Sequence, residues 1–417
     1  MLADGYKDRK LKDKVFSTAK KAKEAAEKYG KENVINATIG SLYDENGKFV
    51  VLKTVADTYK ELPPEEIANY ASSFTGDDDY KKSVLISLFG DEYKNFLKGY
   101  YTSVIATPGG TGAISNTVKN YMNRGDKVLL PQWLWSPYTL MVKEKEGTPE
   151  YYDLFDKSGN ITVSSLGNKI MKLSEVQDNL VIIINDPCQN PTGCRFEKEQ
   201  WLELKEIINS ASKKANIILI LDIAYIDFDT RTEKEKKDIL EIFKNFTSKV
   251  LTVFTFSMSK SLTSYGLRVG AQIALSNSEE VIKEFSYANS FSCRSTWSNV
   301  SRGGMKLFSS IMLNKELQLK LKKEREYYRD ILIKRAELFL KEAKESSLEV
   351  LPYKSGFFLT IPTYEYTSKV EYNLEKNNIF TVVLPEGIRI ALCSVPSDKI
   401  MGLAKRIKNI IDESKNS

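Results

Sequence analysis

Short apolar runs alternate with amphipathic stretches through the middle of the chain. The apolar runs are hydrophobic throughout, which is typical of strands buried on both faces of a parallel sheet. They occupy residues 103–108, 127–131, 179–187, 216–222, 249–257 and 270–276. Helical patterns lie between them, as in "GAISNTVKNYM" and "EKEQWLELKEIINSASKK". Strands that alternate with helices predict βαβ units, so we expect an α/β fold with a mostly parallel sheet covered by helices.

The pattern changes after residue 313. Residues 314–346 lack glycine and proline and predict one long, charge-rich amphipathic helix. Short strands are expected within 348–362 and 387–395, followed by a last helix for which Ser397 is the expected N-cap. We read these elements, together with a helix at 15–29, as a small α+β domain.

Three segments follow from this reading. Residues 1–60 are expected to contribute to the small domain, residues 61–313 to form the large domain, and residues 314–417 to supply the linking helix and the rest of the small domain.

Composition narrows the possible functions. The chain has 417 residues, and its net charge of +6 comes from 61 basic and 55 acidic residues that are interleaved along it. Such a small excess of basic residues, interleaved with acidic ones, gives no indication that the protein binds nucleic acid or a membrane surface. The four cysteines show neither metal-binding spacing nor a disulfide framework, and the chain has no long apolar run. We therefore expect a soluble, cytoplasmic protein.

The chain contains no histidine. This absence excludes Ser-His-Asp and Cys-His catalysis and removes the most common metal ligand, so we expect no metal site. Proton transfer near neutral pH must then use a carboxylate, a tyrosine, a perturbed lysine or a cofactor.

Unusual polar residues follow several predicted strands, where open α/β sheets bind ligands. "ATPGGTGAISN" places glycines between a strand and a helix, which is either a phosphate site or only a tight turn. "NDPCQNPTG" ends a strand at Asn185, and Asn190 is either a ligand-binding amide or an ordinary turn former.

In "LILDIAYIDF", Asp222 ends a strongly apolar strand, with Tyr225 three residues later. A buried carboxylate there needs a cationic partner, either a structural ion pair or a ligand.

The stretch "FTFSMSKSLTSYGLRVG" places Lys260 just past another predicted strand. Lys260 is either the first exposed residue after the strand or a buried amine kept for chemistry. Ser257 and Arg268 flank it and suit a bound phosphate ester. One ligand, pyridoxal 5′-phosphate, uses the whole set of groups: its aldehyde condenses with a lysine, its ring nitrogen needs a carboxylate, and its phosphate needs the glycine turn.

At this point the chain resembles a known family, the fold-type I aminotransferases of class I and II, in the aspartate and aromatic amino acid group. "GGTGA", a tryptophan, "NPTG", "DIAY", "SMSKSLTSYGLRVG" and "GIRIALCS" occur in the family's order and spacing. The resemblance runs from "INATIGSLYDENGKFVVL" to the C-terminus. It implies a seven-stranded sheet in a large domain that binds pyridoxal phosphate.

The resemblance also implies roles for individual residues. Lys260 would form a Schiff base with the cofactor and move the substrate proton, while Asp222 would pair with the pyridinium. Tyr225 and Asn190 would hydrogen-bond the phenolate oxygen. The expected phosphate ligands are Gly110, Thr111, Ser257 and Arg268.

The ring would stack on Trp135, with Trp133 as a competitor for that role. In part of the family a histidine stands three residues after the stacking tryptophan and supports the aspartate. Tyr138 stands there in this chain, so the surroundings of the aspartate differ.

Further residues are implied for the substrate and for a partner subunit. Arg389 would bind the substrate α-carboxylate, and Gly40 would line the substrate site. The family forms homodimers, and Tyr70 is the best match to a tyrosine that reaches the neighbouring subunit's phosphate. Arg294 falls where members that use dicarboxylates place an arginine for the distal carboxylate; otherwise it is an exposed loop arginine.

The resulting hypothesis is a ping-pong aminotransferase that moves an amino group from aspartate or an aromatic amino acid to a 2-oxo acid such as 2-oxoglutarate. A C–S lyase or an amino-acid decarboxylase on the same fold would share the cofactor contacts. A transcription regulator with a cofactor-sensing domain is a third reading. The segment before residue 35 is too short for a winged helix, which argues against it.

Overall fold

The computed structural model describes residues 1–2 and 14–416, which form two compact units. Unit 1 comprises residues 1–49, 334–351 and 357–417, and unit 2 comprises residues 50–333 and 352–356. The division into domains at residues 60 and 313 stays a prediction.

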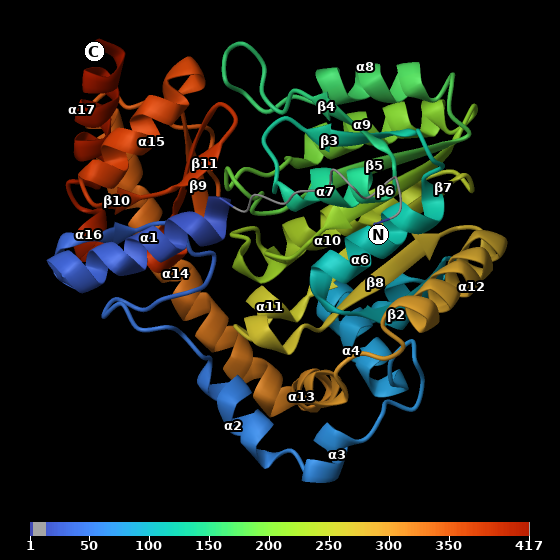
Figure 1. Ribbon diagram of the computed structural model, residues 1–417. Helices are drawn as coiled ribbons and strands as arrows, with labels where there is room; N and C mark the ends of the chain where they lie inside the picture. The colour runs from blue at the N-terminus through green and yellow to red at the C-terminus, as the bar shows by residue number, and fades with distance from the viewer. Residues whose placement is uncertain (3–13, 417) are drawn as a thin grey trace. The chain divides into compact units, whose positions relative to one another are not determined.

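Unit 2 is built on a seven-stranded sheet in the order β2-β8-β7-β6-β5-β3-β4 (Figure 1). Its strands are β2 (Tyr101–Thr107), β3 (Lys127–Pro131), β4 (Thr148–Tyr152), β5 (Asn179–Asn185), β6 (Asn216–Asp222), β7 (Val250–Ser257) and β8 (Gly270–Ser276). Strand β8 runs antiparallel to both of its neighbours, and the other pairs are parallel. The prediction of a mostly parallel sheet is therefore confirmed. The sequence did not reveal β4, because this edge strand is largely polar and pairs with β3 alone.

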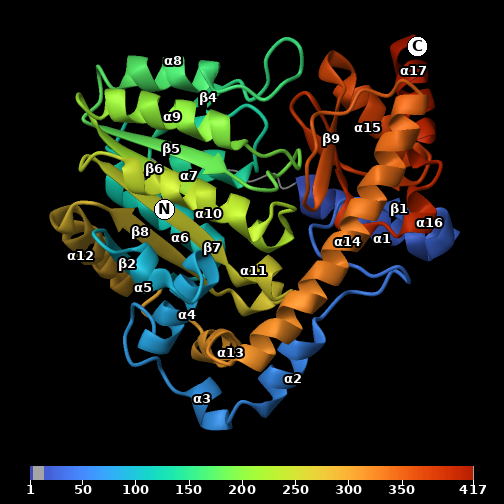
Figure 2. The same cartoon turned by 180° about the vertical axis from the view of Figure 1, so that it is seen from behind.

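Helices cover both faces of this sheet. Helices α6 (Gly109–Tyr121) and α7 (Pro137–Glu144) pack on side chains of β3, β5 and β6 in one apolar cluster. Figure 2, seen from behind, shows α9 (Lys198–Ala211) and α10 (Glu233–Ile242) over the opposite face. The remaining helices of at least four residues that lie wholly in unit 2 are α2 (Lys53–Glu61), α3 (Pro64–Ala68), α4 (Asp78–Phe89), α5 (Tyr93–Phe96), α8 (Ser164–Leu173), α11 (Met258–Ser261), α12 (Glu279–Thr296) and α13 (Arg302–Met312). Coverage on both faces explains why the strands are apolar throughout.

The predicted long helix is α14 (Lys315–Glu345), a continuous helix shared by the two units. Unit 1 has an antiparallel sheet of β11 (Val382–Leu384), β12 (Gly387–Ala391) and β9 (Phe358–Pro362). A second, parallel pair joins β1 (Ile35–Asn36) to β10 (Ile379–Phe380). Its other helices are α1 (Lys14–Tyr29), α15 (Thr367–Lys376), α16 (Ser397–Ile400) and α17 (Leu403–Asn416).

The predicted N-cap of the last helical segment is wrong. Pro396 takes the cap position of α16 with an extended backbone, and Ser397 is the first helical residue. The Ser397 hydroxyl instead donates a hydrogen bond to the Glu45 carboxylate at 3.1 Å. A separate helix, α17, then completes the chain. Within the described residues, no helix is both long enough and apolar enough to cross a membrane.

Candidate active site

Asp222 lies at the carboxyl end of β6, in the interior of unit 2. Its side chain is almost fully buried, with 5% of the residue exposed. The Tyr138 hydroxyl donates to Asp222 Oδ2 at 2.5 Å, and the Ala224 backbone N–H donates to Oδ1 at 3.0 Å. Burial raises the pKa of Asp222, while these two hydrogen bonds and the charge of Lys260 act to lower it. The carboxylate is thus held by a phenol and an amide, with the lysine as a nearby cation.

Lys260 is not simply the first exposed residue after β7. It lies in the single turn of α11 and is partly buried. Its amine is 5.7 Å from the centre of the Tyr225 ring and 5.0 Å from that of Tyr265. The Ser257 hydroxyl caps the start of the turn by accepting from the Ser259 N–H at 3.3 Å. Lys260 is therefore a half-buried amine beside two aromatic rings.

The "NPTG" loop is buried rather than a surface turn. Asn190 is only 6% exposed. The Asn185 side chain, at the end of β5, accepts from the Asn190 N–H at 2.7 Å and donates to the Asp222 carbonyl at 2.8 Å. Asn185 therefore connects the loop to the strand that ends in Asp222. The sequence placed Asn185 at a strand end but did not indicate this connecting role.

The glycine turn, Ser257 and Arg268 converge at the N-terminus of α6. Gly109 has a φ of +73°, and a Cβ atom there would lie 2.5 Å from Arg268 Nη2. A Cβ atom on Gly110 would lie 3.3 Å from the Ser257 Cβ. The Arg268 guanidinium also donates to the Ser259 hydroxyl at 3.1 Å. Free backbone amides, a hydroxyl and a guanidinium in one place form a cradle suited to a phosphate.

The two candidate tryptophans occupy different environments. Trp133 is buried, with 6% exposed, and its carbonyl accepts a hydrogen bond from Gln189. Trp135 is half-buried, and its ring lies edge-on to Tyr138 with the ring centres 5.4 Å apart. Trp135 is therefore the tryptophan that contacts Tyr138, the residue whose hydroxyl donates to Asp222.

Arg389 and Gly40 meet within unit 1. Arg389 is 7% exposed, donates to the Thr38 carbonyl at 3.0 Å and lies 4.1 Å above the centre of the Phe358 ring. A Cβ atom on Gly40 would lie 3.1 Å from the same ring. Phe358 thus forms the surface between the two predicted substrate residues, and nothing in its apolar sequence context distinguished it from a core phenylalanine.

Tyr70 and Arg294, which the sequence placed far apart, line one pocket of about 720 Å³. Tyr70 is 86% exposed. Arg294 lies in the last turn of α12, not on a loop, and donates to the Ser298 hydroxyl at 2.6 Å. The thiol of Cys293 donates to the Phe74 carbonyl at 3.0 Å, which holds the end of α12 against the segment that carries Tyr70.

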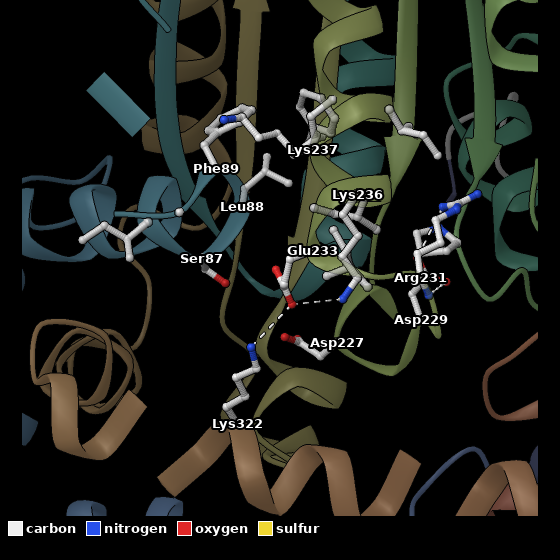
Figure 3. A pocket seen from close by; sticks show the side chains of 18 of the residues that line it. Ser87, Leu88, Phe89, Asp227, Asp229, Arg231, Glu233, Lys236, Lys237 and Lys322 are labelled. Atoms are coloured by element: carbon white, nitrogen blue, oxygen red, sulfur yellow. Dashed lines mark hydrogen bonds and ion pairs between the residues drawn. The ribbon is translucent and has the colours of Figure 1, made fainter. Parts of the chain in front are cut away.

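A second pocket, of about 570 Å³, opens between α4, α10 and α14 (Figure 3). Glu233 stands at its edge between Lys236 and Lys322, at 3.8 and 3.6 Å. The site residues that the sequence predicted do not line it. It is a separate feature of unit 2.

An α/β sheet with a partly buried lysine, a buried carboxylate and an anion cradle at its strand ends defines an enzyme that holds a phosphorylated cofactor. The sequence profile of the family "Aminotransferase class I and II" matches residues 32–407. The chain belongs to this family, and it is therefore a transaminase of a pyridoxal-phosphate-dependent family.

Individual relatives agree with this placement. The crystal structure of an aminotransferase from Anaerococcus prevotii is 34% identical, covers 98% of both chains and superposes with a TM-score of 0.93. The mitochondrial aspartate aminotransferase of Gallus gallus is 24% identical over 68% of this chain, an alignment that spans 66% of that protein. An aromatic-amino-acid aminotransferase from Burkholderia pseudomallei, solved covalently bound to pyridoxal phosphate, is 20% identical, covers 97% of this chain and 99% of its own, and has a TM-score of 0.78.

Proposed function

We propose that this protein transfers an amino group between an L-amino acid, aspartate or aromatic, and a 2-oxo acid such as 2-oxoglutarate. The observation that carries the proposal is the set of groups at the strand ends of unit 2: Asp222, Lys260, Tyr225, Asn190 and the glycine cradle. The two substrate classes come from the names of the Gallus gallus and Burkholderia pseudomallei relatives.

The residues of unit 2 fit pyridoxal phosphate group by group. The cofactor supplies an aldehyde that condenses with an amine and a ring that accepts electrons from the substrate. Its phosphate would bind at the N-terminus of α6. A side chain on Gly109 would collide there with Arg268. Gly110, Thr111, Ser257 and Arg268 are the proposed phosphate ligands, and Trp135 is the proposed stacking partner of the ring.

Asp222 would keep a proton on the ring nitrogen. Its carboxylate is desolvated, and its hydrogen-bond partners are Tyr138 and Ala224, so its charge is available to a cationic ligand. Burial and the neighbouring charge of Asp222 raise the pKa of Tyr138 well above its ordinary value, so this phenol remains a neutral donor to the carboxylate.

Lys260 would hold the cofactor and then, once its amine is released, carry a proton between the substrate α-carbon and the cofactor. Two aromatic rings flank its amine and limit the water around it. Asn190 and Tyr225, both almost fully buried, would hydrogen-bond the phenolate oxygen. These side chains are the groups in unit 2 that we assign to chemistry and cofactor orientation.

Arg389 is the proposed partner of the substrate α-carboxylate. Its guanidinium is buried against Phe358, and a carboxylate can accept two parallel hydrogen bonds from such a group. Gly40 would leave room for the substrate beside the same ring.

We further propose a homodimer in which Tyr70 and Arg294 serve the neighbouring subunit. Both line one pocket, and exposed aromatic side chains occur nearby in the sequence and on α12: Phe74 is 39% exposed, Tyr287 75% and Phe291 77%. Large exposed aromatic groups are a common signature of a protein interface.

Trapping the cofactor tests the proposed function. Protein loaded with pyridoxal phosphate is reduced with borohydride and digested, and mass spectrometry should find the cofactor on Lys260. The variant Lys260→Ala should lose this adduct and all transamination, while Lys236→Ala, which changes a half-buried lysine at the edge of the second pocket, should keep both. Cofactor found on another lysine, or transamination by Lys260→Ala, would refute the assignment.

Arg294 tests the substrate class. If Arg294 binds a distal carboxylate, Arg294→Ala should lower kcat/KM for aspartate and glutamate. The loss should correspond to about 2–5 kcal/mol of activation free energy, because a desolvated charge loses its partner. The values for tyrosine and alanine should change little. Equal losses for all four donors would show that Arg294 supports structure or cofactor instead.

A further inference from the structure

Lys260 lies in a helix that is too short to be stable by itself. Helix α11 has four residues, Met258–Ser261, and a single turn of helix is unfavourable without outside contacts. Its start is capped by Ser257, as described above. At its end, the Leu262 N–H bonds to the Met258 carbonyl and the Thr263 N–H to the Lys260 carbonyl. The Ser261 carbonyl is bound by a side chain from α14.

That side chain is Arg325, which makes three hydrogen bonds. Its Nε donates to the Ser261 carbonyl at 2.7 Å, its Nη2 to the Ser261 hydroxyl at 2.6 Å, and its Nη1 to Asp227 Oδ1 at 2.7 Å. The guanidinium is mostly buried, with 11% of the side chain exposed. Burial lowers the pKa of Arg325, and the carboxylate of Asp227 opposes that effect.

The two contacts of Arg325 adjoin two residues that we assign to the cofactor. Ser261 directly follows Lys260, and Asp227 is two residues after Tyr225 in a short 3₁₀ turn, Ile226–Phe228. We infer that Arg325 is a positioning residue: its planar guanidinium fixes the Lys260 turn against the Tyr225 turn. This inference rests on the proposed function, because it assigns the purpose of the contact to those two side chains.

The planar geometry of the guanidinium group explains why an arginine is needed at position 325. One guanidinium directs its N–H groups in fixed directions in a plane, so it can bind a carbonyl, a hydroxyl and a carboxylate at once. A lysine amine is a point charge on a flexible stem and cannot reproduce this arrangement. Because a misplacement of about 1 Å can cost on the order of 100-fold in rate, the short turn that carries Lys260 is a sensitive element, and Arg325 is the side chain that supports its C-terminal end.

The first test compares Arg325→Ala, Arg325→Lys and the matched control Arg329→Ala. Arg329 is one turn further along α14, and its guanidinium pairs with the neighbouring Asp330 at 3.5 Å. We expect Arg325→Ala to lower kcat by about 10- to 100-fold with KM for the 2-oxo acid changed by less than about threefold. Arg325→Lys should recover only part of the loss, and Arg329→Ala should behave like the wild type.

A second readout needs no cofactor. In apo protein, hydrogen exchange at the Leu262 and Thr263 amides should become faster in Arg325→Ala, because the turn loses its support. Exchange on the buried face of helix α9, at Trp201, Leu204 and Ile208, should stay as in the wild type. If Arg325→Ala fails to fold, Ser261→Ala, which removes the hydroxyl acceptor, and Asp227→Ala, which removes the carboxylate acceptor, should show the same pattern more weakly.

The pocket of about 570 Å³ described above provides a third readout, because both Arg325 and Asp227 line it. Removal of the Arg325 side chain should let small solutes enter the space that the guanidinium occupies, from the side of this pocket. Guanidinium chloride, at concentrations well below those that unfold proteins, should restore part of kcat in Arg325→Ala. Equal concentrations of sodium chloride should not, and Arg329→Ala should not respond to either salt.

The outcomes separate the inference from the proposed function. If borohydride fails to trap cofactor on wild-type Lys260, the proposed function fails. If it succeeds and Arg325→Ala equals Arg329→Ala in kcat and amide exchange, the positioning role is wrong. A loss of kcat that follows only the unfolded fraction, with unchanged exchange in α11 and no rescue, would also overturn it.

Discussion

Two buried carboxylates at the ends of neighbouring strands differ in how the protein compensates for their burial. Asp222 ends β6, and Asp186 follows the last residue of β5; Asn185 and Asp222 are paired in register. They are 5% and 7% exposed, and burial raises the pKa of both. A carboxylate in such a place is costly without compensation.

Asp186 is compensated within the protein. It accepts from the Phe196 N–H at 2.7 Å, and Arg231 Nη1 is 3.6 Å away. Arg231 also pairs with Asp229 at 3.3 Å, and Asp229 pairs with Arg195 at 2.7 Å. These four residues form a mixed cluster of two carboxylates and two guanidiniums, which is a structural arrangement.

Asp222 is compensated differently. Its partners are a neutral phenol and a backbone amide, and the cation near it is Lys260. The contrast teaches that burial alone does not mark a functional carboxylate. A carboxylate left without a contacting guanidinium, beside a lysine and an anion cradle, is the one suited to a cationic ligand.

The largest expected effect separates the two carboxylates directly. Asp222→Asn should lower kcat by about 1,000-fold, roughly 4 kcal/mol, because the ring nitrogen loses its charged partner. Borohydride should still trap cofactor on Lys260 in this variant. Asp186→Asn, the same chemical change one strand away, should keep kcat within about threefold of wild type. Near wild-type rates in Asp222→Asn would return Asp222 to a structural role.

The second prediction concerns stability and pH. Burial, opposed by Arg231, raises the pKa of Asp186 from 3.8 to about 6, so the folded state holds this proton more tightly than the unfolded state. Its contribution to stability is therefore present at low pH and is lost as pH rises from about 4 through about 6. The loss is on the order of 2–3 kcal/mol.

Urea unfolding measured at several pH values checks this prediction. The difference in unfolding free energy between wild type and Asp186→Asn should change across that window and be constant above it. A difference independent of pH would mean that Asp186 keeps an ordinary pKa in the folded protein.

The smallest expected effect tests the phenol that supports Asp222. Tyr138→Phe should lower kcat by about five- to tenfold, since one hydrogen bond to a charged group is lost. That bond lowers the pKa of Asp222, so its removal should move the acidic limb of the kcat–pH profile to higher pH. Tyr152→Phe is a matched control, because Tyr152 is equally buried and its hydroxyl only approaches the Ile183 carbonyl, at 3.5 Å. An unchanged acidic limb in Tyr138→Phe would show that the phenol does not set the charge of Asp222.

The sequence by itself determined the scaffold and the chemical groups. Continuous apolar runs predicted the buried strands, because strands covered on both faces exclude polar residues, and the polar residues at their ends therefore stood out. Asp222, Asn190 and Lys260 were visible for this reason. The edge strand β4 was missed, because its largely polar sequence lacks the apolar pattern of the other strands. The predicted Ser397 cap was wrong, because the Ser397 hydroxyl binds Glu45, a residue far away in the sequence.

Only the tertiary structure decided which charges meet. Arg325 lies 64 residues from its acceptor Ser261, in an amphipathic helix with many other charged residues, so no local pattern distinguished it. The same holds for Asp186, whose compensation depends on Arg231, and for Tyr70 and Arg294, which line one pocket. Secondary structure follows from local periodicity, whereas the electrostatic environment of a side chain depends on groups that folding brings together, and the physical reason is that charge interactions act through space and not along the chain.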